Sequence, residues 1–97
     1  MMEVKLLRIV TGEEVIAEVV EENAATVTVR NGLVVIPQAN QIGFAPWAMA
    51  IDKDNPELVI SRSHVVYMAE VDPGIRDKYD QVYGAGIVKP SKKLILQ

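Results

Sequence analysis

Short runs rich in β-branched residues, separated by turn-forming residues, fill the chain from residue 4 to residue 71. Runs of this composition, bounded by Gly, Pro, Asn or Asp, are typical of β-strands. In residues 15–22, where Glu and Ala favour a helix, the β-branched residues tip the assignment to a strand. The sequence therefore predicts strand segments at residues 4–10, 15–22, 26–36, 42–51, 57–62 and 64–71.

Two glycines define how these segments connect. Gly12 is expected to adopt a positive φ in the tight turn after the first strand. The dipeptide Asn31-Gly32 is typical of a hairpin turn, but the apolar run after it is short and stops at Pro37. We therefore predict one long strand over residues 26–36, kinked at Gly32, as a strongly bent sheet requires.

The pattern changes after residue 71. Asp72 and Pro73 form an N-cap followed by a proline at the first helical position, and Gly84 is a typical C-terminal signal. A short amphipathic helix is predicted over residues 73–83, and residues 87–97 either add an edge strand or form a loose tail. The expected single domain is all-β over residues 1–71, with the C-terminal helix and tail of residues 72–97 packed on it. The predicted apolar face of the helix comprises Ile75, Tyr79, Val82 and Tyr83.

The amino-acid composition excludes several classes of protein. The chain has 97 residues, no cysteine and a formal net charge of −3. Disulfides and thiolate chemistry are therefore excluded, and tight non-specific binding to duplex DNA is not expected. A chain this short buries little apolar surface alone, so we expect copies of it to associate. No apolar run approaches the roughly 20 residues that span a bilayer, and the start lacks signal-peptide features, which predicts a cytoplasmic location.

The sequence gives little support for catalysis. His64 is the only histidine, so one chain cannot build a histidine metal cluster or a Ser-His-Asp constellation. Adjacent carboxylates such as Glu13-Glu14 point to opposite faces of a strand and do not converge on a substrate. We expect neither an enzyme nor a bound metal or cofactor.

Three segments resemble the Sm-like (LSm) family, especially its small members of marine, cyanophage type. They are Val10-Thr11-Gly12-Glu13-Glu14-Val15-Ile16-Ala17-Glu18-Val19, Ile42-Gly43-Phe44-Ala45-Pro46-Trp47 and Leu58-Val59-Ile60-Ser61-Arg62-Ser63-His64-Val65-Val66-Tyr67-Met68. The resemblance implies a strongly bent five-stranded antiparallel barrel. It also implies a closed homo-oligomeric ring, in which the strands around residues 57–62 and 64–71 pair across subunits; the host cytoplasm would be its location if a phage encodes it.

The resemblance further implies a site for single-stranded RNA at a central pore. Carried over to this chain, Arg62 supplies a cation and a stacking plane, His64 lies beside the bases, and Asn23 reads a base edge from the facing loop. Ser63, next to Arg62, belongs to the same turn. Each residue also has a purely structural interpretation: Arg62 as a turn cation, His64 as a half-buried strand residue and Asn23 as a turn former.

Two functions follow from this pattern. The first is a ring that binds single-stranded RNA, possible despite the net charge because symmetry gathers one Arg62 per subunit at the axis. The alternative is an assembly module that binds protein through Phe44 and Trp47 or the C-terminal helix. Acidic residues discriminate between them, because Glu21 and Glu22 on the face that carries Arg62 would repel nucleic acid.

Overall fold

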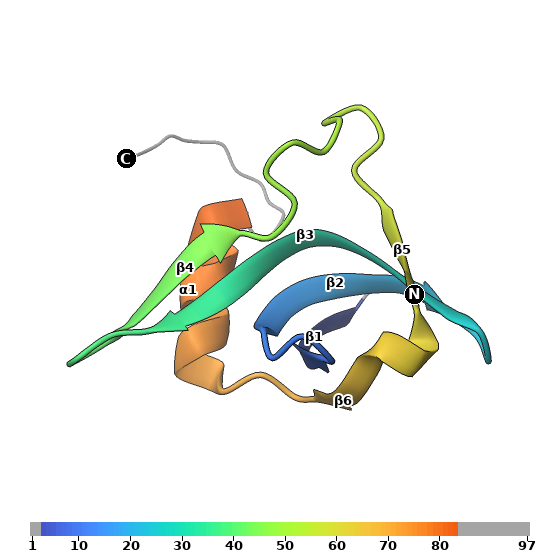
Figure 1. Ribbon diagram of the computed structural model, residues 1–97. Helices are drawn as coiled ribbons and strands as arrows, with labels where there is room; N and C mark the ends of the chain where they lie inside the picture. Colours follow the sequence, from blue (N-terminus) through green and yellow to red (C-terminus); the bar gives the residue numbers. More distant parts are fainter. Residues whose placement is uncertain (1–2, 84–97) are drawn as a thin grey trace.

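The structure is a computed structural model that describes residues 3–83 (Figure 1). The predicted composition of the fold, mostly β with one C-terminal helix, is confirmed. The elements are β1 (Glu3–Ile9), β2 (Glu14–Glu22), β3 (Thr26–Pro37), β4 (Ile42–Pro46), β5 (Leu58–Ser61), the 3₁₀ turn η1 (Arg62–His64), β6 (Val65–Ala69) and α1 (Pro73–Tyr83).

All six strands are antiparallel members of one sheet, ordered β4-β3-β2-β1-β6, with β5 also paired to β3. The long strand β3 pairs with β5 through its first half and with β4 through its second half, and it arches over β2 and β1 in Figure 1. No pairing joins β5 to β6 within residues 3–83, so the sheet is not closed. The structure thus has the six strands that the residue pattern predicts, in an open sheet, whereas the family resemblance implied five strands in a barrel.

A bulge bends β3 near its middle. Ile16 of β2 pairs with Leu33, and Glu18 pairs with Arg30, so β3 has one residue more than β2 between these pairs. Asn31 takes up the extra length with a φ of +54°. The prediction of one long strand is therefore confirmed, and no hairpin forms at Asn31-Gly32. The positive φ lies at Asn31, one residue before the predicted kink at Gly32. The expected positive φ of Gly12 is also confirmed, at +102°.

Apolar side chains fill both faces of the sheet. Leu7, Val15 and Val27 belong to the cluster on the inner face, whereas Leu6 packs with the cluster on the outer face, under α1. Covering of both faces explains why apolar residues do not alternate regularly along β1. Tyr79 of α1 is only 1% exposed and packs against the outer face, so the helix completes the second cluster.

The helix begins and ends where the sequence predicts. The Asp72 carboxylate accepts hydrogen bonds from the amides of Gly74 and Ile75, at 3.0 and 3.2 Å, as an N-cap does. One part of the prediction was wrong: Val82 is 55% exposed, since it lies off the side of the helix that contacts the sheet. This is the only α-helix in residues 3–83, and it is too short and polar to cross a membrane.

Three predicted strand segments are shorter than expected. The segment predicted at residues 57–62 spans only Leu58–Ser61, since Arg62 begins η1. The segment predicted to reach residue 51 ends at Pro46, whose missing amide cannot continue a ladder, and residues 47–57 form a loop. His64, predicted within a strand, lies in η1, and β6 begins only at Val65. The expected tail of residues 87–97 lies outside the described residues.

Candidate functional site

The β2–β3 turn and η1 lie against each other at one end of the sheet. The Arg62 amide donates to the carbonyl oxygen of Ala25 at 2.9 Å, which holds the two turns together. The Arg62 guanidinium lies 2.6 Å from a carboxylate oxygen of Glu22 and 3.5 Å from the carbonyl oxygen of Asn23. The fold therefore brings Asn23 and Arg62 together from segments far apart in the sequence.

Asn23 shapes its own turn. Its side-chain oxygen accepts hydrogen bonds from the amides of Ala25 and Thr26, at 2.8 and 2.9 Å. This is the Asx geometry that makes asparagine frequent in turns. The side-chain NH₂ group donates to no residue in the described part of the chain, so its two donors are available to a ligand.

Ser63 and His64 complete η1. The Ser63 hydroxyl lies 2.8 Å from that of Ser61, the last residue of β5. The His64 carbonyl accepts a hydrogen bond of 2.8 Å from the amide of Val10, which ties η1 to the end of β1. The His64 side chain is exposed, because the residue lies in the turn and not in the strand. All four predicted site residues are thus within or beside two contacting turns.

Acidic side chains surround the arginine of this region. Glu22 pairs with Arg62, and both side chains are exposed by nearly half, 44% and 46%. Glu21 is exposed in the same turn region. An exposed pair of this kind contributes at most about 1 kcal/mol to stability, but it offsets the arginine charge. Repeating a neutral pair around a ring builds no strong positive field, and this weighs against binding of nucleic acid.

The two predicted protein-contact residues pack into different clusters. Phe44 is half-buried against the outer-face cluster that contains Tyr79. Trp47 is half-buried against the inner cluster, and its indole N–H donates to a Glu13 carboxylate oxygen at 3.2 Å. Burial of Phe44 depends on the helix, which a local sequence pattern does not reveal. The two side chains do not share one exposed patch.

Three of the eight large apolar residues that are exposed in residues 3–83 lie on two edge strands. Val59 of β5 is 62% exposed, and Val66 and Tyr67 of β6 are 61% and 39% exposed. In residues 3–83, β5 pairs only with β3, and β6 pairs only with β1. Each of these strands therefore has one edge whose backbone groups have no strand partner.

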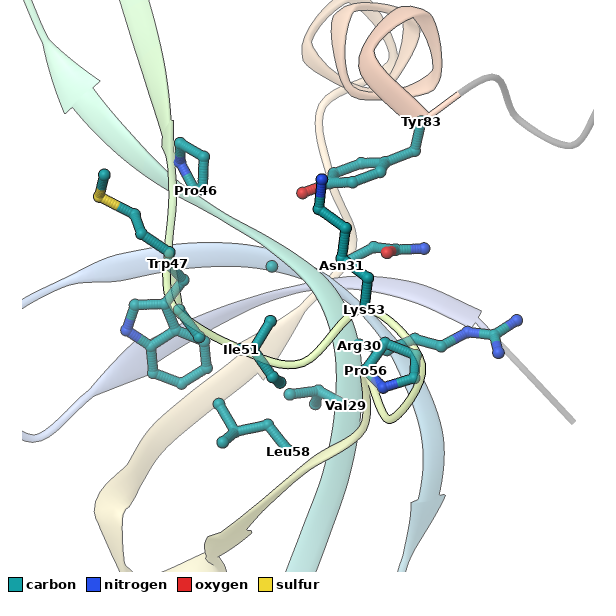
Figure 2. A pocket seen from close by; sticks show the side chains of 13 residues that line it. Val29, Arg30, Asn31, Pro46, Trp47, Ile51, Lys53, Pro56, Leu58 and Tyr83 are labelled. Atoms are coloured by element: carbon teal, nitrogen blue, oxygen red, sulfur yellow. The ribbon is translucent and has the colours of Figure 1, made fainter.

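A pocket of about 520 Å³ opens between β3, the 47–57 loop and the end of α1 (Figure 2). The sequence does not reveal this pocket, because it depends on where β4 ends and β5 begins along β3. The only local signal was Pro46, which limits how far β4 can extend. Its main lining residues are Val29, Trp47, Ile51, Lys53, Leu58 and Tyr83.

Neither a metal site nor a similarity to known proteins indicates what the chain does. Residues 3–83 contain no group of three or more His, Asp or Glu side chains placed to hold a metal ion. The chain matches no protein-family model and none of the curated proteins with which it was compared.

Proposed function

We propose that the chain is the subunit of a closed, Sm-like homo-oligomeric ring and acts as a non-catalytic assembly module. The observation that carries the proposal is the pair of unpartnered strand edges on β5 and β6, with Val59, Val66 and Tyr67 exposed on them. Family resemblance in the sequence supports the ring; the open sheet supports pairing between copies.

The composition of these strands favours association. Soluble proteins commonly protect an edge strand with lysine, proline or a bulge. Neither β5 nor β6 contains a proline or any charged residue. Association of a second strand with such an edge removes part of the valine surface from water, and this lowers the free energy of the pair. Nothing in either strand therefore opposes pairing with a second copy.

Symmetry then favours a ring. The resemblance to Sm-like proteins implies that β5 of one copy pairs with β6 of the next. Such pairing is head to tail, because the two edges are different surfaces of the same chain. A head-to-tail interface forms a ring when its rotation closes and a filament when it does not.

The test is a charge placed on one edge, Val66→Lys, with Val82→Lys as the matched control. Val82 is similarly exposed, at 55%, but lies on α1. We expect light scattering to give an oligomer for the wild type and Val82→Lys and a much smaller species for Val66→Lys. A monomeric wild type, or equal masses for the two variants, would contradict the proposal.

Single-stranded RNA is the second candidate ligand, and the contact between the Asn23 and Arg62 turns favours it. An unpaired side-chain amide and a guanidinium at one turn are suited to reading and stacking a base. The Glu22 carboxylate opposes this role, and that opposition can be measured. Labelled oligo-U should bind less tightly to Arg62→Ala and more tightly to Glu22→Gln, with a steep salt dependence. If the wild type, Arg62→Ala and Glu22→Gln all fail to bind oligo-U, RNA binding is excluded and the assembly module remains as the proposed function.

A further inference from the structure

The pocket arises from a gap between two strands. Pro46 of β4 pairs with Leu33, whereas Leu58 of β5 pairs with Val29. Residues 30–32 of β3 therefore have no strand beside them on this edge, and one hydrogen bond, from the Trp47 amide to the Gly32 carbonyl at 3.0 Å, bridges it. The 47–57 loop passes over the gap and encloses space in place of a strand.

Most of the lining is apolar. Val29, Trp47, Ile51 and Leu58 surround the space in Figure 2. Its volume of about 520 Å³ falls within the usual range for small-molecule sites, which are mainly apolar with a few polar groups. The lining therefore suits an apolar body of modest size.

The polar groups of the pocket include one cation without an ion-pair partner in residues 3–83. Arg30 is paired with Glu18 at 2.9 Å, whereas Lys53 forms no salt bridge there. The neighbouring Asp52 carboxylate accepts hydrogen bonds from the Asp54 amide and the Asn55 side chain, which engage it within its own turn. Lys53 is thus the charge that the pocket offers to a ligand.

Tyr83 adds a hydrogen-bond donor on the same side of the pocket, where Figure 2 shows the Lys53 side chain extending toward the tyrosine. Burial raises the pKa of the Tyr83 phenol, and the nearby Glu18 carboxylate raises it further. The phenol therefore remains protonated at neutral pH and can donate to an anion.

We propose that this pocket binds a small amphipathic anion, with its apolar part against Trp47, Ile51 and Leu58 and its acidic group at Lys53. The occupant is a small molecule with a carboxylate or sulfonate on an aliphatic or aromatic body. This inference goes beyond the assembly function and does not depend on it.

Trp47 provides a direct probe, since it is the only tryptophan in the chain. The experiment titrates 8-anilinonaphthalene-1-sulfonate into the wild type and follows dye emission excited through Trp47. We expect saturable, Trp47-sensitised emission. The variant Lys53→Glu should weaken dye binding by about tenfold, because a nearby attractive charge becomes a repulsive one. Lys78→Glu, the same charge change on an exposed position of α1, should bind as the wild type does.

A competition experiment shows whether the pocket binds the dye through its negative charge or only through its apolar surface. Octanoate should displace the dye from the wild type at much lower concentration than 1-octanol, and this difference should vanish in Lys53→Glu. Two results would overturn the proposal. One is the absence of saturable dye binding to the wild type. The other is equal dye binding by Lys53→Glu and Lys78→Glu.

Discussion

The phenol hydroxyl of Tyr79 donates a hydrogen bond to the backbone carbonyl of Asn31 at 2.7 Å. Tyr79 is the most buried residue of α1, and Asn31 has the positive φ at the bulge of β3. This bond therefore attaches the helix to the point at which the longest strand bends. Helix packing and sheet curvature are linked through these two residues.

Tyr79→Phe should lower the free energy of unfolding by about 1–2 kcal/mol, because a buried carbonyl loses its partner. Tyr79→Ala should lower it by about 3–5 kcal/mol, since a buried aromatic ring is lost as well. Urea denaturation followed by circular dichroism measures both. Tyr67→Phe is the control for loss of a hydroxyl, as the Tyr67 hydroxyl bonds to Glu14 at the surface. Equal stability of Tyr79→Phe and Tyr67→Phe would contradict this assignment.

The same tyrosine predicts sensitivity to alkaline pH. Burial raises the pKa of the Tyr79 phenol far above its ordinary value near 10.0. Above about pH 10 the unfolded chain releases this proton and the folded chain keeps it, so stability falls as the pH rises, by at most about 1.4 kcal/mol per pH unit. Below that pH the contribution is constant.

Urea titrations of the wild type and Tyr79→Phe, on both sides of about pH 10, test this prediction. The wild type should lose more stability than the variant across that interval. Tyr83, whose phenol pKa is also raised by burial, should leave a smaller dependence in the variant. Parallel losses in the two proteins would show that Tyr79 is not the group responsible.

Local signals made several elements predictable from the sequence. The turn at Gly12 and the helix start at Asp72-Pro73 depend on residues that are adjacent in the chain, and both were predicted correctly. The long β3 strand was also predicted, because the short run before Pro37 argued against a hairpin. Its kink occurs through Asn31, whose side chain tolerates the left-handed conformation.

Long-range contacts explain what the sequence did not reveal. Glu22 and Arg62 are 40 positions apart, so their ion pair follows from the fold and not from any local pattern. The end of β4, and with it the pocket, is determined by how two separate strands share β3. The burial of Phe44 similarly depends on a helix that follows it by nearly thirty residues.

Substitution of Gly12 tests backbone conformation alone, because a new Cβ atom there would contact nothing. No atom lies within 4 Å of the position where a Cβ would be added, so only the backbone conformation, with φ at +102°, disfavours another residue. Gly12→Ala should therefore destabilise the protein by about 1 kcal/mol. Gly12→Asn should cost less, because asparagine tolerates positive φ better than alanine. Thermal unfolding of the two variants tests the order; an alanine variant as stable as the wild type would contradict it.

The most direct test of the central claim, closed assembly through the β5 and β6 edges, is native mass spectrometry of the wild type over a range of protein concentrations. A closed ring predicts one dominant species whose mass is an integer multiple of the 10.7 kDa chain and does not grow with concentration. A monomer at every concentration would contradict assembly. A continuous series of masses that lengthens with concentration would mean that the edges pair into an open chain, and it would contradict closure.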